Sequence, residues 1–176
     1  MTDDIRARMV EFLPRLRRFA YSLTGDRDQG DDLVQETCTR ALARMDQWQP
    51  GTRLDSWMFR IAQNAWFDRA RAKKVRGEVI DIDDAHDLSD TDGRKVTENR
   101  LTLGVVSAGI ARLPDDQRVL ITLVCVEGLS YKEAAEQLQV PIGTVMSRLA
   151  RARQTLHRLV DDEGRIPMAN PERRHD

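Results

Sequence analysis

The stretch Leu129–Leu156 reads LSYKEAAEQLQVPIGTVMSRLARARQTL. Ser130 and Glu133 have the spacing of a capping box, in which each side chain bonds the other residue's backbone amide at a helix start. Val140-Pro141 interrupts the helical pattern that follows. Only Gln139–Ile142 then separate this helix from a second one. Two helices joined by so short a turn indicate a helix-turn-helix.

The second helix of the pair has two distinct faces when residues are projected at about 100° each. One face predicts a core stripe, and the opposite face is polar and basic. Hydroxyls near a helix start, with arginines further along, suit the major groove of DNA and its phosphates. A solvated, arginine-rich helix in a bundle would show the same pattern, so both interpretations stay open. The stripe is Val145, Leu149, Ala152 and Leu156, and the polar face is Thr144, Ser147, Arg151, Gln154 and Arg158.

Charge is unevenly distributed along the chain. The net charge is −1, from 28 Lys and Arg and 29 Asp and Glu. Residues 67–76 nevertheless contain five basic residues and one acid, whereas residues 78–92 contain seven acids and no Lys or Arg. The near-zero sum therefore hides two basic regions and an acidic spacer, and the distribution matters more for nucleic-acid binding than the sum.

The rest of the chain is read as helices with local start and stop signals. Apolar residues at three- and four-residue spacing predict a helix from Ile5 to Leu23, with Gly25 as its stop and Asp26 as the next N-cap. A third helix runs from Leu54 to a break at Gly77. Periodicity then disappears until residue 101. We therefore predict an all-α fold of two small helical domains (1–76 and 101–162), joined by an acidic flexible linker (77–100) and followed by a flexible tail (163–176).

The third helix carries a second candidate nucleic-acid surface. Cations, an amide and an aromatic ring on one stripe can hold phosphates, pair with an exposed base and stack on it. An ordinary surface with a partly buried phenylalanine is the competing interpretation. The stripe is Arg53, Arg60, Asn64, Phe67 and Arg71.

Patterns typical of other functions are weak. His86, His157 and His175 are scattered without ligand-like spacing, so no metal or other cofactor is expected. There is no glycine-rich phosphate loop and no nucleophile elbow, so no enzyme is indicated. Cys38 and Cys125 form no CxxC pair, and the amino terminus lacks the apolar core of a secretory signal. We expect a cytoplasmic protein without membrane insertion.

Four motifs resemble those of bacterial RNA polymerase sigma factors. In chain order they are DDLVQET (31–37), SWMFRIAQN (56–64), LPDDQR (113–118) and LSYKEAAEQLQVPIGTVMSRLARAR (129–153). The resemblance covers about residues 5–75 and 101–160, and the size and two-part layout are similar to the extracytoplasmic-function (ECF) group. It implies an alternative sigma factor, monomeric when free, that directs promoter-specific transcription initiation and is held inactive by an anti-sigma factor. Autoregulation is common in that group.

The resemblance also implies a role for each domain. The first, region two, would bind the clamp of the largest polymerase subunit through Asp32, Gln35 and Glu36, and would melt the minus-ten element. The second, region four, would bind the polymerase flap and read the minus-thirty-five element of promoter DNA as duplex. The implied minus-ten residues are Trp48, Arg53, Arg60, Asn64, Phe67 and Arg71, and the minus-thirty-five residues are Thr144, Ser147, Arg148, Arg151 and Arg158.

Two positions depart from the family pattern. Met146 stands where the family often has Lys or Arg, and Gln139 holds a turn position usually held by Gly. If that turn needs a positive φ, the strain is ~1 kcal/mol.

Two other functions remain open at this point. A sigma-like decoy would bind an anti-sigma factor but not polymerase. Such mimics usually carry a receiver domain, for which 176 residues leave no room. An ordinary helix-turn-helix transcriptional regulator would not account for DDLVQET or for the third helix.

Overall fold

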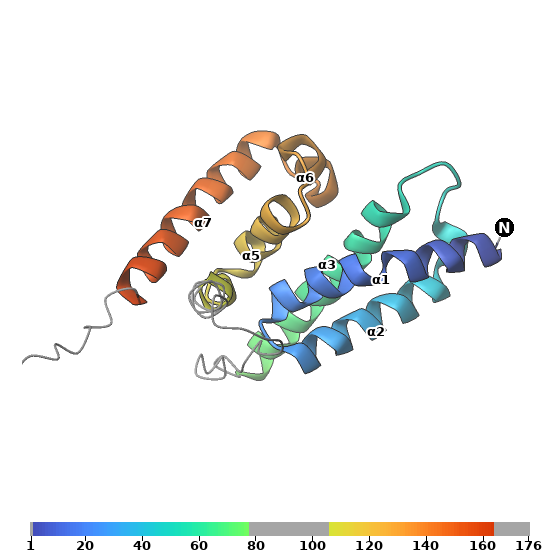
Figure 1. Ribbon diagram of the computed structural model, residues 1–176, viewed down its shortest axis with the longest axis horizontal. Helices are drawn as coiled ribbons and strands as arrows, with labels where there is room; N and C mark the ends of the chain where they lie inside the picture. Colours follow the sequence, from blue (N-terminus) through green and yellow to red (C-terminus); the bar gives the residue numbers. More distant parts are fainter. Residues whose placement is uncertain (1, 78–105, 164–176) are drawn as a thin grey trace, which may run out of the picture.

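The computed structural model describes residues 2–77 and 106–163, and the regular elements within those ranges are all helical (Figure 1). The first domain consists of α1 (Thr2–Thr24), α2 (Arg27–Ala43) and α3 (Leu54–Arg76), with a 3-10 turn at Met45–Gln47. The second domain begins with a helix described over 106–111. It continues with α5 (Asp115–Ile121), a π-helical segment (Thr122–Val126), α6 (Tyr131–Leu138) and α7 (Ile142–Glu163). The prediction of an all-α fold with two helical domains is confirmed. The predicted linker and tail lie outside the described residues, except for Gly77 and Glu163.

The helix ends of the first domain follow the local signals in the sequence. Gly25 adopts φ 68°, which ends α1, and the Asp26 side chain accepts a 2.7 Å hydrogen bond from the Gln29 amide at the start of α2. Gly77 ends α3 with φ 69°, and its amide bonds the carbonyls of Lys73 and Lys74. Short polar caps and left-handed glycines are the usual partners of otherwise unpaired helix-end groups.

The three helices of the first domain enclose an aromatic and aliphatic core. Phe59 lies between Phe12 and Phe19, with ring centroids 5.0 and 4.9 Å away. The approach of α1 to α2 is close at Gly30, where an added Cβ would lie 2.2 Å from Cδ1 of Tyr21. Glycine at this position therefore sets the distance between the two helices.

The second domain contains the predicted helix-turn-helix. Ser130 and Glu133 form both bonds of the capping box at the start of α6. Gln139 ends α6 in the left-handed region with φ 54°, the conformation anticipated for this turn position. The predicted inner stripe of α7 is buried, because Val145, Leu149 and Ala152 are at most 1% exposed. The helix that follows Pro114 changes its hydrogen-bonding pattern before its end, since Thr122–Val126 is π-helical.

Candidate polymerase and nucleic-acid interfaces

The predicted polymerase-docking residues lie on α2, and they differ in exposure. Asp32 and Gln35 are exposed. Glu36 is half-buried, and its two carboxylate oxygens each lie 2.6 Å from a guanidinium nitrogen, one of Arg40 and one of Arg69. Glu36 therefore joins α2 to α3, and it is not a freely exposed carboxylate. Asp32 and Gln35 remain available to a partner.

Three of the predicted minus-ten residues contact the protein itself. Trp48 is only 7% exposed and packs in the first core, with the Arg8 guanidinium 5.4 Å from the centroid of its ring. Arg71 is exposed and donates a 2.6 Å hydrogen bond to Asp68. Arg53 begins α3 and bonds two carboxylates, one from each domain. The structure therefore divides this predicted set between the core, the surface and the domain interface.

The other three minus-ten residues lie together on α3 at a cavity between the domains. Arg60, Asn64 and Phe67 form one wall of a space of about 230 Å³. Arg60 and Asn64 are exposed, and Phe67 is half-buried against the first core. The remaining wall is mostly the second domain, including the helix-turn-helix: Gln63, Asp116, Gln137, Leu138, Gln139, Val140 and Arg148.

The predicted minus-thirty-five residues lie on α7, and the outer ones are accessible. Ser147, Arg151 and Arg158 are exposed. Arg151 has no hydrogen-bond or ion-pair partner in the described part of the chain, so its guanidinium is available to a ligand. Thr144 is half-buried, and Arg148 is half-buried with its Nε 3.3 Å from Asp116. The exposed cations thus lie along the middle and far turns of the helix.

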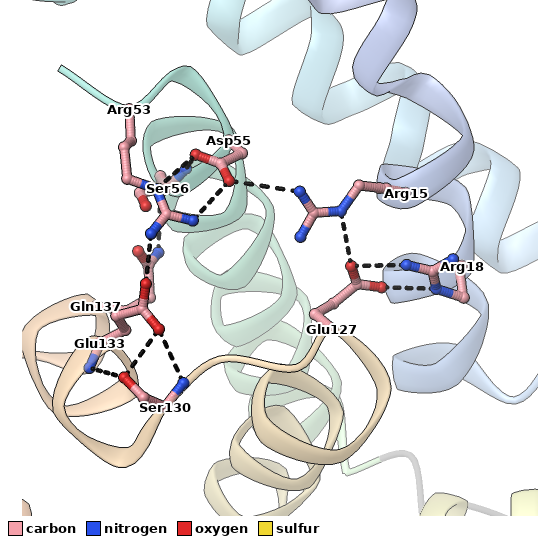
Figure 2. A network of polar contacts seen from close by, with 9 residues as sticks. All are labelled: Arg15, Arg18, Arg53, Asp55, Ser56, Glu127, Ser130, Glu133 and Gln137. Atoms are coloured by element: carbon pink, nitrogen blue, oxygen red, sulfur yellow. Dashed lines mark hydrogen bonds and ion pairs between the residues drawn. The ribbon is translucent and has the colours of Figure 1, made fainter. Parts of the chain in front are cut away.

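The two domains are joined by ion pairs around Glu127, just before α6 (Figure 2). The Glu127 side chain is fully buried, and its two oxygens accept 3.0 Å hydrogen bonds from Nε and Nη2 of Arg18. Arg15 donates a third bond of 3.2 Å from Nε, and its Nη1 lies 3.4 Å from Asp55. Two parallel N–H···O bonds between an arginine and a carboxylate are among the stronger polar contacts in proteins.

A second ion pair joins the start of α3 to the start of α6 (Figure 2). Arg53 donates to Asp55 at 2.8 Å and to Glu133 at 2.5 Å. The amide and hydroxyl of Ser130 also bond Glu133, and together with Arg53 they lower the pKa of the Glu133 carboxyl to about 2. The Arg53 guanidinium likewise holds the pKa of Asp55 below its usual range. The capping glutamate of the helix-turn-helix is therefore also a contact to the first domain.

Arg118, in the LPDDQR motif, is buried where the domains meet. Its Nη1 donates a 2.9 Å hydrogen bond to the Leu23 carbonyl at the end of α1. Its guanidinium lies 5.2 Å from the ring centroid of Trp66 on α3, and burial lowers its pKa. Nearby, Val119 and Leu123 are fully buried in the core cluster of the first domain. The two domains therefore share apolar core as well as ion pairs.

Arg15, Arg18 and Glu127 were not predicted from the sequence as interface residues. The signal available was weak, because Arg15, Arg18 and Glu127 are charged residues within otherwise apolar helical stretches. Their partners are about a hundred residues away along the chain, and no local pattern pairs them.

Known sequence families match both domains. Residues 104–156 match the family described as Sigma-70, region 4, and residues 9–63 match the family described as the Sigma2 domain of PhyR. Within the described residues, no helix combines the length and apolar character needed to span a membrane.

Several curated relatives match nearly the whole chain. The ECF RNA polymerase sigma factor EcfG of Rhodopseudomonas palustris (strain TIE-1) is 39% identical over 166 residues, which cover 93% of this chain and 89% of the relative. The ECF RNA polymerase sigma factor SigW of Bacillus subtilis (strain 168) is 29% identical over 170 residues, which cover 91% of each chain.

Solved structures show the same architecture. The sigma factor RpoE of Bartonella quintana, in complex with the anti-sigma factor NepR, superposes with a TM-score of 0.69 and 32% identity, over 90% of this chain and 97% of that chain. CnrH, in complex with the cytosolic domain of CnrY, gives a TM-score of 0.67 at 24% identity, over 93% of this chain and 91% of that chain. The likeness to CnrH bears on the fold alone.

Proposed function

Because the chain belongs to the ECF family of RNA polymerase sigma factors, we propose that it binds core polymerase and directs it to a defined set of promoters. It is an alternative sigma factor, a transcription initiation factor whose work is binding and not chemistry on a substrate. Polymerase binding would place that work in the cytoplasm.

The observation that carries this proposal is that two different parts of one chain expose side chains suited to nucleic acid. The helix-turn-helix exposes Arg151 and Arg158 on α7, which suits duplex DNA. The separate first domain carries Arg60, Asn64 and Phe67 on one stripe of α3, which suits unpaired bases. A repressor that reads only duplex DNA has no use for the second surface.

Each surface has a proposed partner. Asp32 and Gln35, exposed on α2, are proposed to dock on the clamp of the largest polymerase subunit. Region two, about residues 1–76, would hold the melted minus-ten strand, and region four, about residues 101–162, would bind the flap and read the minus-thirty-five duplex. Extruding a base from its stack costs a few kcal/mol, which contacts from α3 would offset.

An anti-sigma factor is the proposed regulatory partner. The Bartonella sigma factor, which is 32% identical, was solved in complex with the anti-sigma factor NepR. The match covers 90% of the chain described here and 97% of the Bartonella chain. That degree of likeness supports a partner of the same class for this protein.

A sigma-like decoy is the second candidate. The observation that favours it is the match of residues 9–63 to the Sigma2 domain of PhyR. A decoy would bind the anti-sigma factor without binding core polymerase. The two candidate functions therefore differ in the affinity of the chain for core polymerase.

The deciding experiment is titration of the full chain against purified core polymerase, followed by biolayer interferometry. A sigma factor should bind core polymerase in the nanomolar range, and Asp32→Ala should weaken that binding by about tenfold, which corresponds to ~1.4 kcal/mol. Glu11→Ala is the matched control, because Glu11 is an exposed carboxylate on α1 without a partner among the described residues. No binding by the wild-type chain would indicate the decoy or an ordinary regulator.

A further inference from the structure

The first turns of α7 carry large apolar side chains that lie half in water. Ile142 is 50% exposed and Met146 is 54% exposed. A spacing of four residues places Ile142, Met146 and the exposed Ala150 one above the other along the helix, and we call these three residues the apolar ridge. Among the described residues, the other large apolar side chains exposed to this degree lie one each on α1, α2 and α3: Val10, Leu42 and Val75.

The helix surface next to the apolar ridge is low. Gly143 lies between the ridge and Ser147 when residues are projected at about 100° each. An added Cβ at Gly143 would meet no other element of the described chain within 4 Å, so internal packing does not require a glycine there. Glycine nevertheless lowers helix stability relative to alanine. Its effect here is to let an external surface approach the backbone of α7 closely, with Met146 standing out beside it.

Cations lie on both sides of the apolar ridge. Arg151, which directly follows Ala150, is exposed on the face proposed to meet the minus-thirty-five duplex. Arg153 lies further along the edge of the helix that carries Met146, and its Nη2 bonds the hydroxyl of Tyr131 at 3.3 Å. A surface that combines exposed methyl and thioether groups with cations on both sides is complementary to a polyanion, and its continuity with the DNA-reading face indicates that the polyanion is duplex DNA.

Thymine offers the apolar group that such a ridge can contact. In the major groove the C5-methyl group distinguishes thymine from the other bases, and apolar side chains recognise it by direct contact. Methionine suits this contact, because its unbranched, polarisable side chain adapts to the position of a partner. An uncharged side chain forms no ion pair with phosphate, so Met146 would contribute to the choice of sequence and not to the general affinity for DNA.

From these observations we propose that the apolar ridge of α7 reads thymine methyl groups in the minus-thirty-five element, with Met146 as a specificity-determining residue. The base pair that faces Met146 then carries a thymine on one of its two strands. The inference rests on the proposed function, because it takes the DNA-reading role of α7 from there.

The test removes single methyl groups from the DNA. Deoxyuridine keeps the hydrogen-bonding groups and the phosphate of thymidine, and it lacks only the C5-methyl group. Polymerase holoenzyme, assembled from core polymerase and the full chain, is titrated against a fluorescent fragment of the promoter upstream of the protein's own gene. Each thymine of the minus-thirty-five region is replaced in turn on both strands. We expect one or two positions at which uracil weakens binding about fourfold, which corresponds to ~0.8 kcal/mol for one buried carbon group.

A variant of the protein identifies the side chain that contacts the methyl group. Met146→Ala should bind the thymine and uracil promoters equally, because the contact is then absent from both complexes. Val10→Ala is the matched control, since Val10 is a large apolar side chain on α1 that is 63% exposed. The control should keep the fourfold difference between thymine and uracil. Both substitutions are at side chains more than half exposed, so neither removes a core contact.

Three results would overturn the inference and leave the proposed function intact. The first is specific promoter binding with equal affinity for thymine and uracil at every position. The second is a uracil effect that Met146→Ala retains, because another group then contacts the methyl. The third is weaker binding of Met146→Ala to core polymerase without DNA, which would make the ridge a protein-docking surface. Wild-type holoenzyme that binds no promoter specifically is a different result, because it overturns the proposed function together with the inference.

Discussion

At the residue scale, Gln139 combines a strained backbone with a position inside the helix-turn-helix. Its φ of 54° is the only positive value at a non-glycine residue in the described part of the chain. The left-handed region costs an ordinary residue roughly 1–2 kcal/mol, whereas glycine adopts it freely. The side chain is exposed and therefore contributes little packing in return.

Gln139→Gly should therefore stabilise the protein. Relief of the backbone strain is partly offset by the larger entropy of glycine in the unfolded chain, about 0.4–1 kcal/mol. We expect a net gain of ~0.5–1 kcal/mol in the free energy of unfolding, measured by urea denaturation. A loss of stability would mean that the Gln139 side chain makes a contact worth more than the strain.

Arg151 and Arg158 differ in their expected contact with DNA. Arg151 lies near the middle of the exposed face of α7 without a partner in the described residues, so it is free to bond a guanine edge. Arg158 lies two turns further along and bonds the Gln154 carbonyl at 3.4 Å. We therefore expect Arg158 to contact a phosphate and not a base edge.

Arg151→Ala should cost ~1–3 kcal/mol of binding and relax specificity at one base pair, whereas Arg158→Ala should weaken all sequences equally and flatten the salt dependence. The measurement is binding of the polymerase holoenzyme to single-base minus-thirty-five variants at two salt concentrations. Equal weakening of every variant by Arg151→Ala would make that residue a phosphate contact.

At the scale of elements, α2 has one exposed side, which is proposed to meet polymerase, and one side that packs on the rest of the first domain. Alanine at a surface position without a structural contact leaves stability within about ±0.5 kcal/mol, as we expect for the exposed Gln35. Glu36 differs, because from a half-buried position it pairs with Arg40 on α2 and with Arg69 on α3, and the second pair links the two helices.

Glu36→Ala should lower the free energy of unfolding by ~1 kcal/mol, since it removes a carboxylate shared by two half-buried arginines. Gln35→Ala should leave stability unchanged and weaken core polymerase binding. Thermal denaturation and the core titration separate the two effects. Equal stability losses in both variants would show that Gln35 is structural as well.

The helices themselves were predictable, because their signals are local. Asp26, Gly25, Gly77 and the Ser130–Glu133 box each mark a helix end through contacts within a few residues. The buried stripe of α7 follows from helical periodicity alone. The burial of Trp48 and the ion pair of Glu36 with Arg69 could not be predicted from the sequence, because both depend on how helices pack against one another.

At the scale of the whole molecule, the packing of one domain on the other was not predictable. The bonds of Arg18 with Glu127 join residues 109 positions apart, and the chain between them contains a segment without periodicity. The sequence around a charged residue does not indicate which distant charged residue it will pair with. The sequence predicted two nucleic-acid surfaces, and the structure places part of one of them, Arg53 and the half-buried Phe67, where the two domains meet.

The packing of the second domain against the first should be stable across the neutral range of pH. Glu133 has a pKa of about 2 in the folded chain, and the pKa of Asp55 is also lowered, so both carboxylates are charged at neutral pH. Their contribution is present above the unfolded pKa and is lost only as pH falls towards the folded one. Small-angle scattering should show no expansion between roughly pH 5.5 and 8. Expansion of the chain within that pH range would show that a different titrating group controls the contact between the domains.

Run-off transcription tests the central claim, that this chain directs core polymerase to a promoter. Purified core polymerase and the full chain are combined on the promoter upstream of the protein's own gene. We predict one discrete transcript that requires the chain, that Asn64→Ala abolishes and that the Glu11→Ala control retains. The contradicting result would be a chain that binds core polymerase and yet changes nothing in transcription. In that case the wild type and Asn64→Ala would both give the transcript pattern of core polymerase alone.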